Sequence, residues 1–183
     1  MHSGSWKPVS YTHLDVYKRQ LSGIPYWTTD IGGFVFGNPT DPAFRELFIR
    51  WFQYGTFNPI LRVHGTRHPD ENELWSYGPD AQTILVNFDR LRYRMLPYIY
   101  SLAWKTTSEA YTPMRPLVMD FRADPRAQNV GDQFMYGPAF LVNPVTDPGA
   151  TTRQLYLPEA KWYDFWTGIA GEGGRTILSL IHI

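Results

Sequence analysis

The polar and apolar positions of residues 41–55 follow the repeat of an amphipathic helix. Asp41 is a good N-cap, Pro42 suits the first helical position, and Gly55 is typical of a helix C-terminus. The apolar residues recur at i, i+3, i+4, i+7 and i+8, which places them on one wide face and favours packing in a hydrophobic core. They are Phe44, Leu47, Phe48, Trp51 and Phe52.

Short apolar runs on either side of this helix have the composition of β-strands. The first, at residues 23–30, ends in Asp30 and is followed by a Gly-Gly pair that permits a sharp turn. The second, at residues 59–64, ends in His64. Because the repeat from Asp30 to His64 spans 34 residues, the sequence predicts a βαβ unit with parallel, neighbouring strands.

Asp30 and His64 are the candidate site residues of this unit. The carboxyl ends of neighbouring parallel strands form the edge that carries the site in α/β enzymes. Each residue alone also has a structural interpretation, since Asp30 can cap the turn with its own side chain and a lone histidine after an apolar run is usually structural. An acid and a histidine at equivalent strand ends favour a functional pair.

The pattern changes from helical to β periodicity near residue 112. A long helix is predicted over residues 80–109, with a kink or break at Pro97 because proline cannot donate the helical hydrogen bond. Beyond it, turn signals separate short β runs, which is typical of an antiparallel β domain. These runs lie at 115–121, 133–136, 139–145, 152–157 and 161–166.

Composition narrows the classes of function. Charged residues make up 19% and the formal net charge is +0, which gives no electrostatic reason to expect nucleic acid or an acidic membrane surface as a partner. The absence of cysteine excludes disulfides and thiolate metal sites, and no apolar run reaches the roughly 18 residues of a membrane span. Aromatic residues, at 16%, suit both stacking on sugar rings and a large core.

The polar loop at residues 66–78 contains residue types that bind metals, but without a recognised ligand spacing. We therefore predict a solvated loop and no metal site, with Trp75 available as the wall of a pocket. The metal-binding residue types in this loop are His68, Asp70, Glu71 and Glu73.

The two ends of the chain differ from the rest. Residues 1–20 show no clean period and run into the first strand without a turn signal, and much of this stretch resembles translated sequencing-adapter read-through. The tail at 177–183 resembles the same kind of artefact. We expect both ends to be non-native, so that residues 21–176 are the natural segment of a longer protein.

Five motifs follow one another along the chain: GIPYWTTDIGGF at 23–34, RVHG at 62–65, LRYRMLPYIY at 91–100, GPAFLVNPV at 137–145 and LYLP at 155–158. Together they resemble glycoside hydrolase family 31, of the α-xylosidase and α-glucosidase type, and RVHG with NELW at 72–75 is most similar to the α-xylosidases. The resemblance implies the C-terminal portion of a (β/α)8 TIM barrel over residues 21–111. Part of an antiparallel β-sandwich is implied over residues 112–176.

The resemblance also implies roles for individual residues. Asp30 and His64 lie at the ends of barrel strands seven and eight and hydrogen-bond the sugar at the point of cleavage, while Phe34 and Trp27 shape the pocket. A place in the core is an equally good interpretation of Trp27. Members of the family are retaining enzymes with an aspartate nucleophile and an aspartate general acid/base, both expected upstream of Leu21.

These implications define the predicted activity. The parent enzyme releases α-linked xylose or glucose from the non-reducing ends of an oligosaccharide or α-glycoside, with no cofactor, nucleic acid or membrane partner. This chain supplies sugar-binding residues but no catalytic carboxylate, so we predict that it has no glycosidase activity alone. We expect an enzyme of the bacterial cytoplasm or periplasm.

Two other functions fit parts of the sequence. A carbohydrate-binding module without catalysis suits the β-rich second half and the aromatic residues, but not the strand–helix–strand unit. A phosphate-binding barrel enzyme needs a Gly-rich loop that meets a helix N-terminus, and one Gly-Gly pair is too short a signal. An open parallel edge and an uncovered helix face predict a chain that is unstable by itself.

Overall fold

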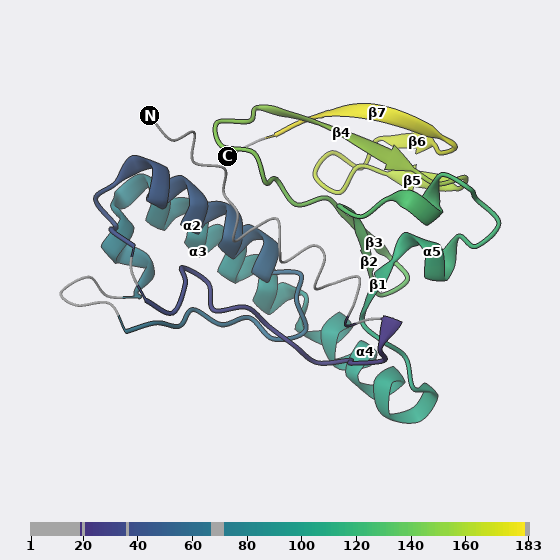
Figure 1. Ribbon diagram of the computed structural model, residues 1–183, viewed down its shortest axis with the longest axis horizontal. Helices are drawn as coiled ribbons and strands as arrows, with labels where there is room; N and C mark the ends of the chain where they lie inside the picture. Colours follow the sequence, from purple (N-terminus) through teal and green to yellow (C-terminus); the bar gives the residue numbers. More distant parts are fainter. Residues whose placement is uncertain (1–18, 20, 36, 67–71, 182–183) are drawn as a thin grey trace.

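A computed structural model of the chain describes residues 19, 21–35, 37–66 and 72–181. A helical part comes first along the chain and a β-rich part follows it (Figure 1). The helices are α2 (Pro42–Gly55), η1 (Leu74–Tyr77), α3 (Pro79–Arg94), α4 (Leu96–Glu109), α5 (Leu117–Asp120) and η2 (Ala127–Asn129). The strands are β1 (Met114–Pro116), β2 (Phe134–Tyr136), β3 (Phe140–Val142), β4 (Thr152–Leu157), β5 (Lys161–Tyr163), β6 (Ala170–Glu172) and β7 (Arg175–Leu180).

Helices α2, α3 and α4 begin and end close to where the sequence predicts. The Asp41 carboxylate caps α2 by accepting a hydrogen bond of 3.1 Å from the backbone N–H of Ala43, and α2 ends at Gly55. The predicted long helix is broken into α3 and α4 at Met95, with Pro97 in the first turn of α4. Proline lacks the N–H that would continue the ladder, and its ring collides with the carbonyl four residues earlier.

The described strands form three antiparallel sheets, with strand orders β1-β2-β3, β4-β7 and β5-β6. The antiparallel character of the second half is therefore confirmed. Strand β7 was not predicted because the sequence analysis set the C-terminal stretch aside. Its last residues belong to the segment 177–183 and pair with β4, with Leu180 opposite Thr152. That this segment is non-native stays a prediction, because pairing does not reveal the origin of a sequence.

The prediction of two regular strands in the first half of the chain is wrong. Residues 23–30 and 59–64 run side by side but share one parallel bridge, between Ile31 and Val63, instead of a ladder. The predicted parallel direction is confirmed, while regular strands did not form because a strand pair with no further neighbour is only marginally stable.

The prediction of a single strand at 115–121 is also wrong. It forms β1 and then turns into α5. Pro116 has no N–H for a continued ladder, and Arg115 reaches forward to the Asp120 carboxylate over 2.8 Å.

One hydrophobic core joins the helical and β-rich parts. It contains Phe48 of α2 and Leu85 of α3 together with Tyr136 of β2, all fully buried. The phenol of Tyr136 also donates a hydrogen bond of 3.2 Å to the carbonyl of Asn58, directly before the second predicted strand. The β-rich part therefore helps to fix the chain that leads to His64. No helix among the described residues is long and apolar enough to cross a membrane.

A second junction between the two parts is polar. Glu46 of α2 accepts a hydrogen bond of 2.9 Å from the N–H of Gly149, and Arg50 donates one of 3.1 Å to the carbonyl of Ala150. Arg50 is only 3% exposed, and burial lowers the pKa of its guanidinium although Glu46 opposes this effect. Helix α2 thus holds the loop before β4 in place.

Candidate functional site

The bridge between Ile31 and Val63 divides the two parallel segments into two faces. Ile31 is fully buried and Val63 packs against the same core, on the side of helix α2. Side chains along an extended chain point alternately to opposite sides. Asp30, Arg62 and His64 therefore lie together on the face that points away from the helices.

Helix α2 sets the position of the first segment. A side chain at Gly55 would come within 2.6 Å of Ile31 Cδ1, so the close approach of helix and segment requires glycine there. The indole N–H of Trp51 donates a hydrogen bond of 2.7 Å to the hydroxyl of Thr29, the residue before Asp30. Packing and a polar tie together fix the backbone that carries Asp30.

Arg92 of α3 sets the position of the second segment. Its guanidinium donates to the carbonyls of Thr56, at 2.9 Å, and Pro59, at 2.8 Å, and it also bonds the carbonyl of Asn58. A buried carbonyl without a partner is costly, so this fan of bonds holds the turn from which the segment leading to His64 starts. Arg92 therefore has a structural role, because its guanidinium bonds backbone carbonyls of the protein.

The Gly-Gly pair turns the chain directly after Asp30. Gly32 and Gly33 have φ values of 91° and 78°, which favour glycine. The N–H of Gly33 bonds the backbone carbonyl of Asp30 at 2.7 Å. The turn is therefore closed by the backbone of Asp30 and not by its side chain, so the carboxylate is released for another contact.

That contact is an ion pair with Arg62. The Arg62 guanidinium bonds Oδ1 of Asp30 across the two strand ends. Within the described residues, Oδ2 of Asp30 and both ring nitrogens of His64 have no hydrogen-bond partner. The strand ends thus present an oriented carboxylate oxygen and a histidine with unoccupied hydrogen-bonding capacity.

Phe34 borders this cluster and Trp27 does not. The Phe34 ring lies 5.4 Å from the His64 ring, centroid to centroid, and Phe34 is 50% exposed. A backbone bond of 2.8 Å from Thr66 to the Phe34 carbonyl holds the two connecting loops together. Trp27 is 5% exposed within the hydrophobic core, so it supports the first segment from behind.

The sequence analysis missed Arg62 as a member of the site. The signal that identifies it is alternation, since a residue two positions before His64 in a strand shares its face. The other predicted candidates, in the loop at 66–78, add little to the site. Trp75 is 66% exposed on η1, and three of the four metal-binding residue types of the loop, His68, Asp70 and Glu71, lie outside the described residues. Among the described residues no group of three or more histidines and carboxylates is close enough to hold a metal ion.

A polar cavity of about 230 Å³ lies elsewhere, in the β-rich part. Its lining includes Asp132, Asp147 and Arg153, but Asp132 and Arg153 are already paired with each other at 2.6 Å. It has no contact with Asp30 or His64. The chemistry of paired strand ends makes the edge at Asp30 and His64 the stronger candidate site.

A helix between two parallel segments with polar ends, followed by an antiparallel domain, is the arrangement expected at the end of an α/β barrel. Residues 2–102 match the sequence model of the glycosyl hydrolases family 31 TIM-barrel domain, and residues 110–182 match that of the glycosyl hydrolase family 31 C-terminal domain. The chain belongs to glycoside hydrolase family 31. The barrel match begins at residue 2 and so includes residues 2–20 of the stretch 1–20, whose non-native origin stays a prediction.

Individual relatives agree with this assignment. The α-xylosidase of Saccharolobus solfataricus is 55% identical over 156 residues, which are 85% of this chain and 21% of that protein. Human neutral α-glucosidase C is 38% identical over 178 residues, 96% of this chain and 19% of that protein. The chain therefore spans about a fifth of the length of these relatives.

A solved structure extends the comparison to the fold. The crystal structure of a GH31 α-xylosidase from a soil metagenome, complexed with xylose, superimposes with a TM-score of 0.87 at 39% identity. The match covers 91% of this chain and 27% of that one. The fold is thus the end of the family 31 barrel with its C-terminal domain, and the antiparallel sheets of the second half belong to the latter.

Proposed function

We propose that this chain is the sugar-binding end of the catalytic barrel, with the domain that follows it, from a retaining α-xylosidase. The observation that carries the proposal is the cluster at the strand ends. Asp30 and His64 share one face, and each keeps hydrogen-bonding capacity unused within the described residues. Hydroxyl groups of a sugar are the natural partners of a fixed carboxylate and an imidazole.

Three side chains at the strand ends contribute to recognition of the sugar. Oδ2 of Asp30 accepts a hydrogen bond from one sugar hydroxyl, and His64 bonds a neighbouring hydroxyl. Phe34, which leans over His64 at 5.4 Å, places its ring against the C–H face of the pyranose. Trp27 acts behind the pocket, by holding the segment that carries Asp30 against the core.

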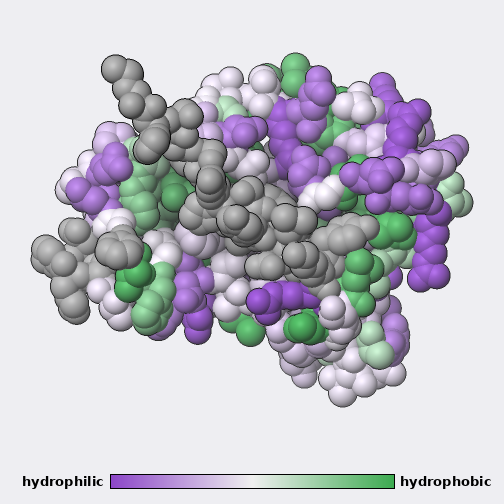
Figure 2. Space-filling model, viewed as in Figure 1, coloured by the Kyte–Doolittle hydropathy of each residue, from purple (hydrophilic) through white to green (hydrophobic). Residues whose placement is uncertain are grey.

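The face that carries these groups is incomplete in this chain. Ile24, Tyr26 and Ile60 follow the same alternation as Asp30 and Arg62, and they are 40%, 45% and 44% exposed. Hydrophobic (green) surface reaches the exterior in several separate areas of the view in Figure 2. Exposed apolar strand faces are a liability for a soluble protein, which supports a parent in which further barrel strands cover them.

The catalytic step is assigned to residues that precede Leu21 in the parent. Retention requires two carboxyl groups about 5–5.5 Å apart on either side of the glycosidic bond. Asp30 is held by Arg62 and serves binding in this proposal, so it fills neither catalytic role. The isolated chain of 183 residues is accordingly expected to bind no more than weakly and to hydrolyse nothing.

Xylose is the proposed sugar because of the relatives. The α-xylosidase of Saccharolobus solfataricus is 55% identical to this chain, against 38% for human neutral α-glucosidase C. The soil-metagenome α-xylosidase that shares the fold was solved with xylose. Xylose lacks the C6 hydroxymethyl group of glucose, and the complete pocket must distinguish the two sugars by this difference.

A chimeric enzyme tests the proposal. Residues 21–176 replace the matching stretch of the Saccharolobus solfataricus α-xylosidase, and hydrolysis of an aryl α-xyloside and an aryl α-glucoside is measured. We expect an active chimera that prefers the xyloside, and Asp30→Asn should lower kcat/KM by about 100-fold or more. The matched control is Asp120→Asn, which removes the carboxylate of another Arg–Asp pair, formed with Arg115 at 2.8 Å, and should leave kcat/KM unchanged.

Three results would contradict the proposal. The first is an inactive but folded chimera, the second is full activity of the Asp30→Asn variant, and the third is turnover by the 183-residue chain alone. A preference for the glucoside would correct the sugar while the assignment to an α-glycosidase stands.

A further inference from the structure

We infer that Arg62 is a positioning residue of the sugar site, which acts through Asp30. The inference rests on the proposed function of Asp30. The resemblance to the family assigned roles to Asp30 and His64 and none to Arg62, which lies on the second of the two segments. The structure brings all three to one face, with Arg62 against Oδ1 of Asp30.

The pair has the geometry of an orienting contact. Asp30 and Arg62 stand on neighbouring parallel segments, tied beside them by a backbone bond of 3.2 Å from the Ile31 N–H to the Arg62 carbonyl. Arg62 therefore meets Asp30 from a fixed backbone position. Because the guanidinium engages one carboxylate oxygen, rotation of the carboxylate is restricted and the other oxygen is presented to a ligand.

Stability gives little reason for such a pair. The side chains of Arg62 and Asp30 are 48% and 30% exposed, and exposed ion pairs contribute little to folding because water screens them. The backbone bond and the Ile31–Val63 bridge already hold the two strand ends together. A role in fixing the direction of the carboxylate accounts for an arginine here better than a role in folding.

The chemistry of the site explains why orientation matters. A carboxylate that rotates freely contacts a sugar hydroxyl in many geometries, and a displacement of 1 Å in a binding group can cost about 100-fold in rate. Arg62 does not need to touch the sugar to have this effect. Arginine suits the task because its planar group holds a fixed direction, whereas a lysine ammonium is a flexible point charge.

The test is a double-mutant cycle in the active chimera, with Arg62→Ala, Asp30→Asn and the double variant. We expect Arg62→Ala to lower kcat/KM for the aryl α-xyloside by about 10- to 100-fold. In the Asp30→Asn background, the same change should lower it by less than about threefold, because the residue through which Arg62 acts is already disabled. Arg62→Lys should recover part of the activity, since one charged donor remains.

Matched measurements separate positioning from folding. Arg115→Ala removes the arginine of the other Arg–Asp pair and should leave kcat/KM unchanged, and thermal unfolding should show Arg62→Ala as stable as the parent chimera. An unchanged kcat/KM in Arg62→Ala, or equal losses in both backgrounds of the cycle, would overturn the inference. Failure of the proposed function appears separately, as activity that does not respond to Asp30→Asn.

Discussion

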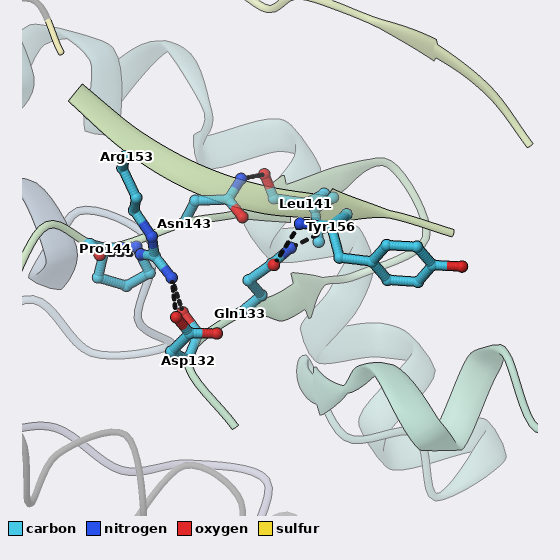
Figure 3. A network of polar contacts seen from close by, with 7 residues as sticks. All are labelled: Asp132, Gln133, Leu141, Asn143, Pro144, Arg153 and Tyr156. Carbon is cyan, nitrogen blue, oxygen red and sulfur yellow. Dashed lines mark hydrogen bonds and ion pairs between the residues drawn. The ribbon is translucent and has the colours of Figure 1, made fainter. Parts of the chain in front are cut away.

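Two polar clusters of this protein contain an arginine and an aspartate, yet they differ in what their bonds accomplish. At the strand ends, Arg62 and Asp30 are 48% and 30% exposed, and His64 beside them has no hydrogen-bond partner among the described residues. In the β-rich part, Arg153 is surrounded by protein acceptors. It bonds the carbonyls of Pro144 and Asp132, the latter at 2.7 Å (Figure 3).

The second cluster continues into the sheet. Gln133 is 6% exposed, and its amide exchanges two hydrogen bonds with the backbone of Tyr156, of 2.8 Å and 2.7 Å. Figure 3 shows the side chain of Gln133, which lies directly before β2, directed at Tyr156 of β4. Burial lowers the pKa of the Arg153 guanidinium, while Asp132 opposes the shift.

The difference supports the proposal that the strand-end cluster is the one that binds a ligand. A buried polar group must have a partner, because leaving it unpaired costs free energy. Arg153 and Gln133 of the β-rich part meet this need with protein partners, so their bonds belong to the structure. The strand-end cluster leaves donors and acceptors at a surface, where a sugar can use them. We therefore expect changes at the strand-end cluster to alter activity and changes at the cluster in the β-rich part to alter stability.

The largest effect is expected for His64→Ala in the chimera. The variant should lose about 100-fold or more in kcat/KM, because it removes a group that we propose to bond the sugar directly. Its thermal unfolding should match that of the parent chimera, since His64 makes no hydrogen bond within the described structure. A large drop in unfolding temperature would show that His64 is a structural residue and would remove the distinction between the clusters.

The next largest effect is expected for Gln133→Ala, on stability and not on activity. Gln133→Ala should lower the free energy of unfolding by about 2–4 kcal/mol, because two buried backbone groups of Tyr156 lose their partner. The kcat/KM of the folded variant should stay the same. Urea unfolding and steady-state kinetics on one preparation measure both quantities, with Gln154→Ala, an exposed neighbour, as the control that changes neither.

A smaller, pH-dependent effect is expected at Tyr98, which joins α4 to the sheet. Its hydroxyl donates a hydrogen bond of 2.8 Å to the Tyr136 carbonyl and accepts one of 3.2 Å from the Ala139 N–H. Burial raises the pKa of Tyr98 to about 12, although the bond from Ala139 opposes the shift. The folded protein thus favours the neutral phenol, so this stabilisation is present below the unfolded pKa of about 10 and is lost as pH rises toward 12.

The variant Tyr98→Phe tests whether this stabilisation is lost as pH rises. The variant should be less stable by about 1 kcal/mol at neutral pH. The difference from the parent should shrink between about pH 10 and 12, as measured by urea unfolding at several pH values. A difference that grows in that interval would mean that the folded state favours the ionised phenol.

The smallest effect is expected at the rim of the β-rich cluster. The Tyr156 hydroxyl donates to Oδ2 of Asp124 at 2.5 Å, and this bond lowers the pKa of Asp124 below its ordinary 3.8. A lowered pKa stabilises the fold above the ordinary value, and the contribution is lost as pH falls through the folded one. Tyr156→Phe should therefore be slightly destabilising at pH 7 and neutral in strong acid. Thermal unfolding at both pH values tests this, and an equal deficit at both would refute the bond's role.

Local sequence rules predicted the helices and the direction of the two parallel segments. Asp41, Pro42 and Pro97 act through their own backbone chemistry, so their effects are visible without a tertiary structure. The prediction of regular strands at 23–30 and 59–64 was wrong, because strand regularity depends on neighbours that are distant in sequence. The strand at 115–121 was wrong for a local reason, the proline at 116.

The candidate site was predicted in part. Asp30 and His64 were found because a βαβ spacing places them at equivalent ends, and the single parallel bridge beside them supports that geometry. Arg62 was missed because a strand pattern does not show which charged side chain turns toward which partner. The roles of Asp30, His64, Phe34 and Trp27 in binding a sugar stay predictions.

The most direct test of the account is a crystal structure of the active chimera with xylose bound. We expect Oδ2 of Asp30 and a ring nitrogen of His64 within about 2.7–3.2 Å of sugar hydroxyls, with Arg62 still on Oδ1 of Asp30 and the Phe34 ring against the sugar. Xylose held by other residues, with Asp30 and His64 beyond hydrogen-bond distance, would contradict the assignment of the strand ends as the sugar site.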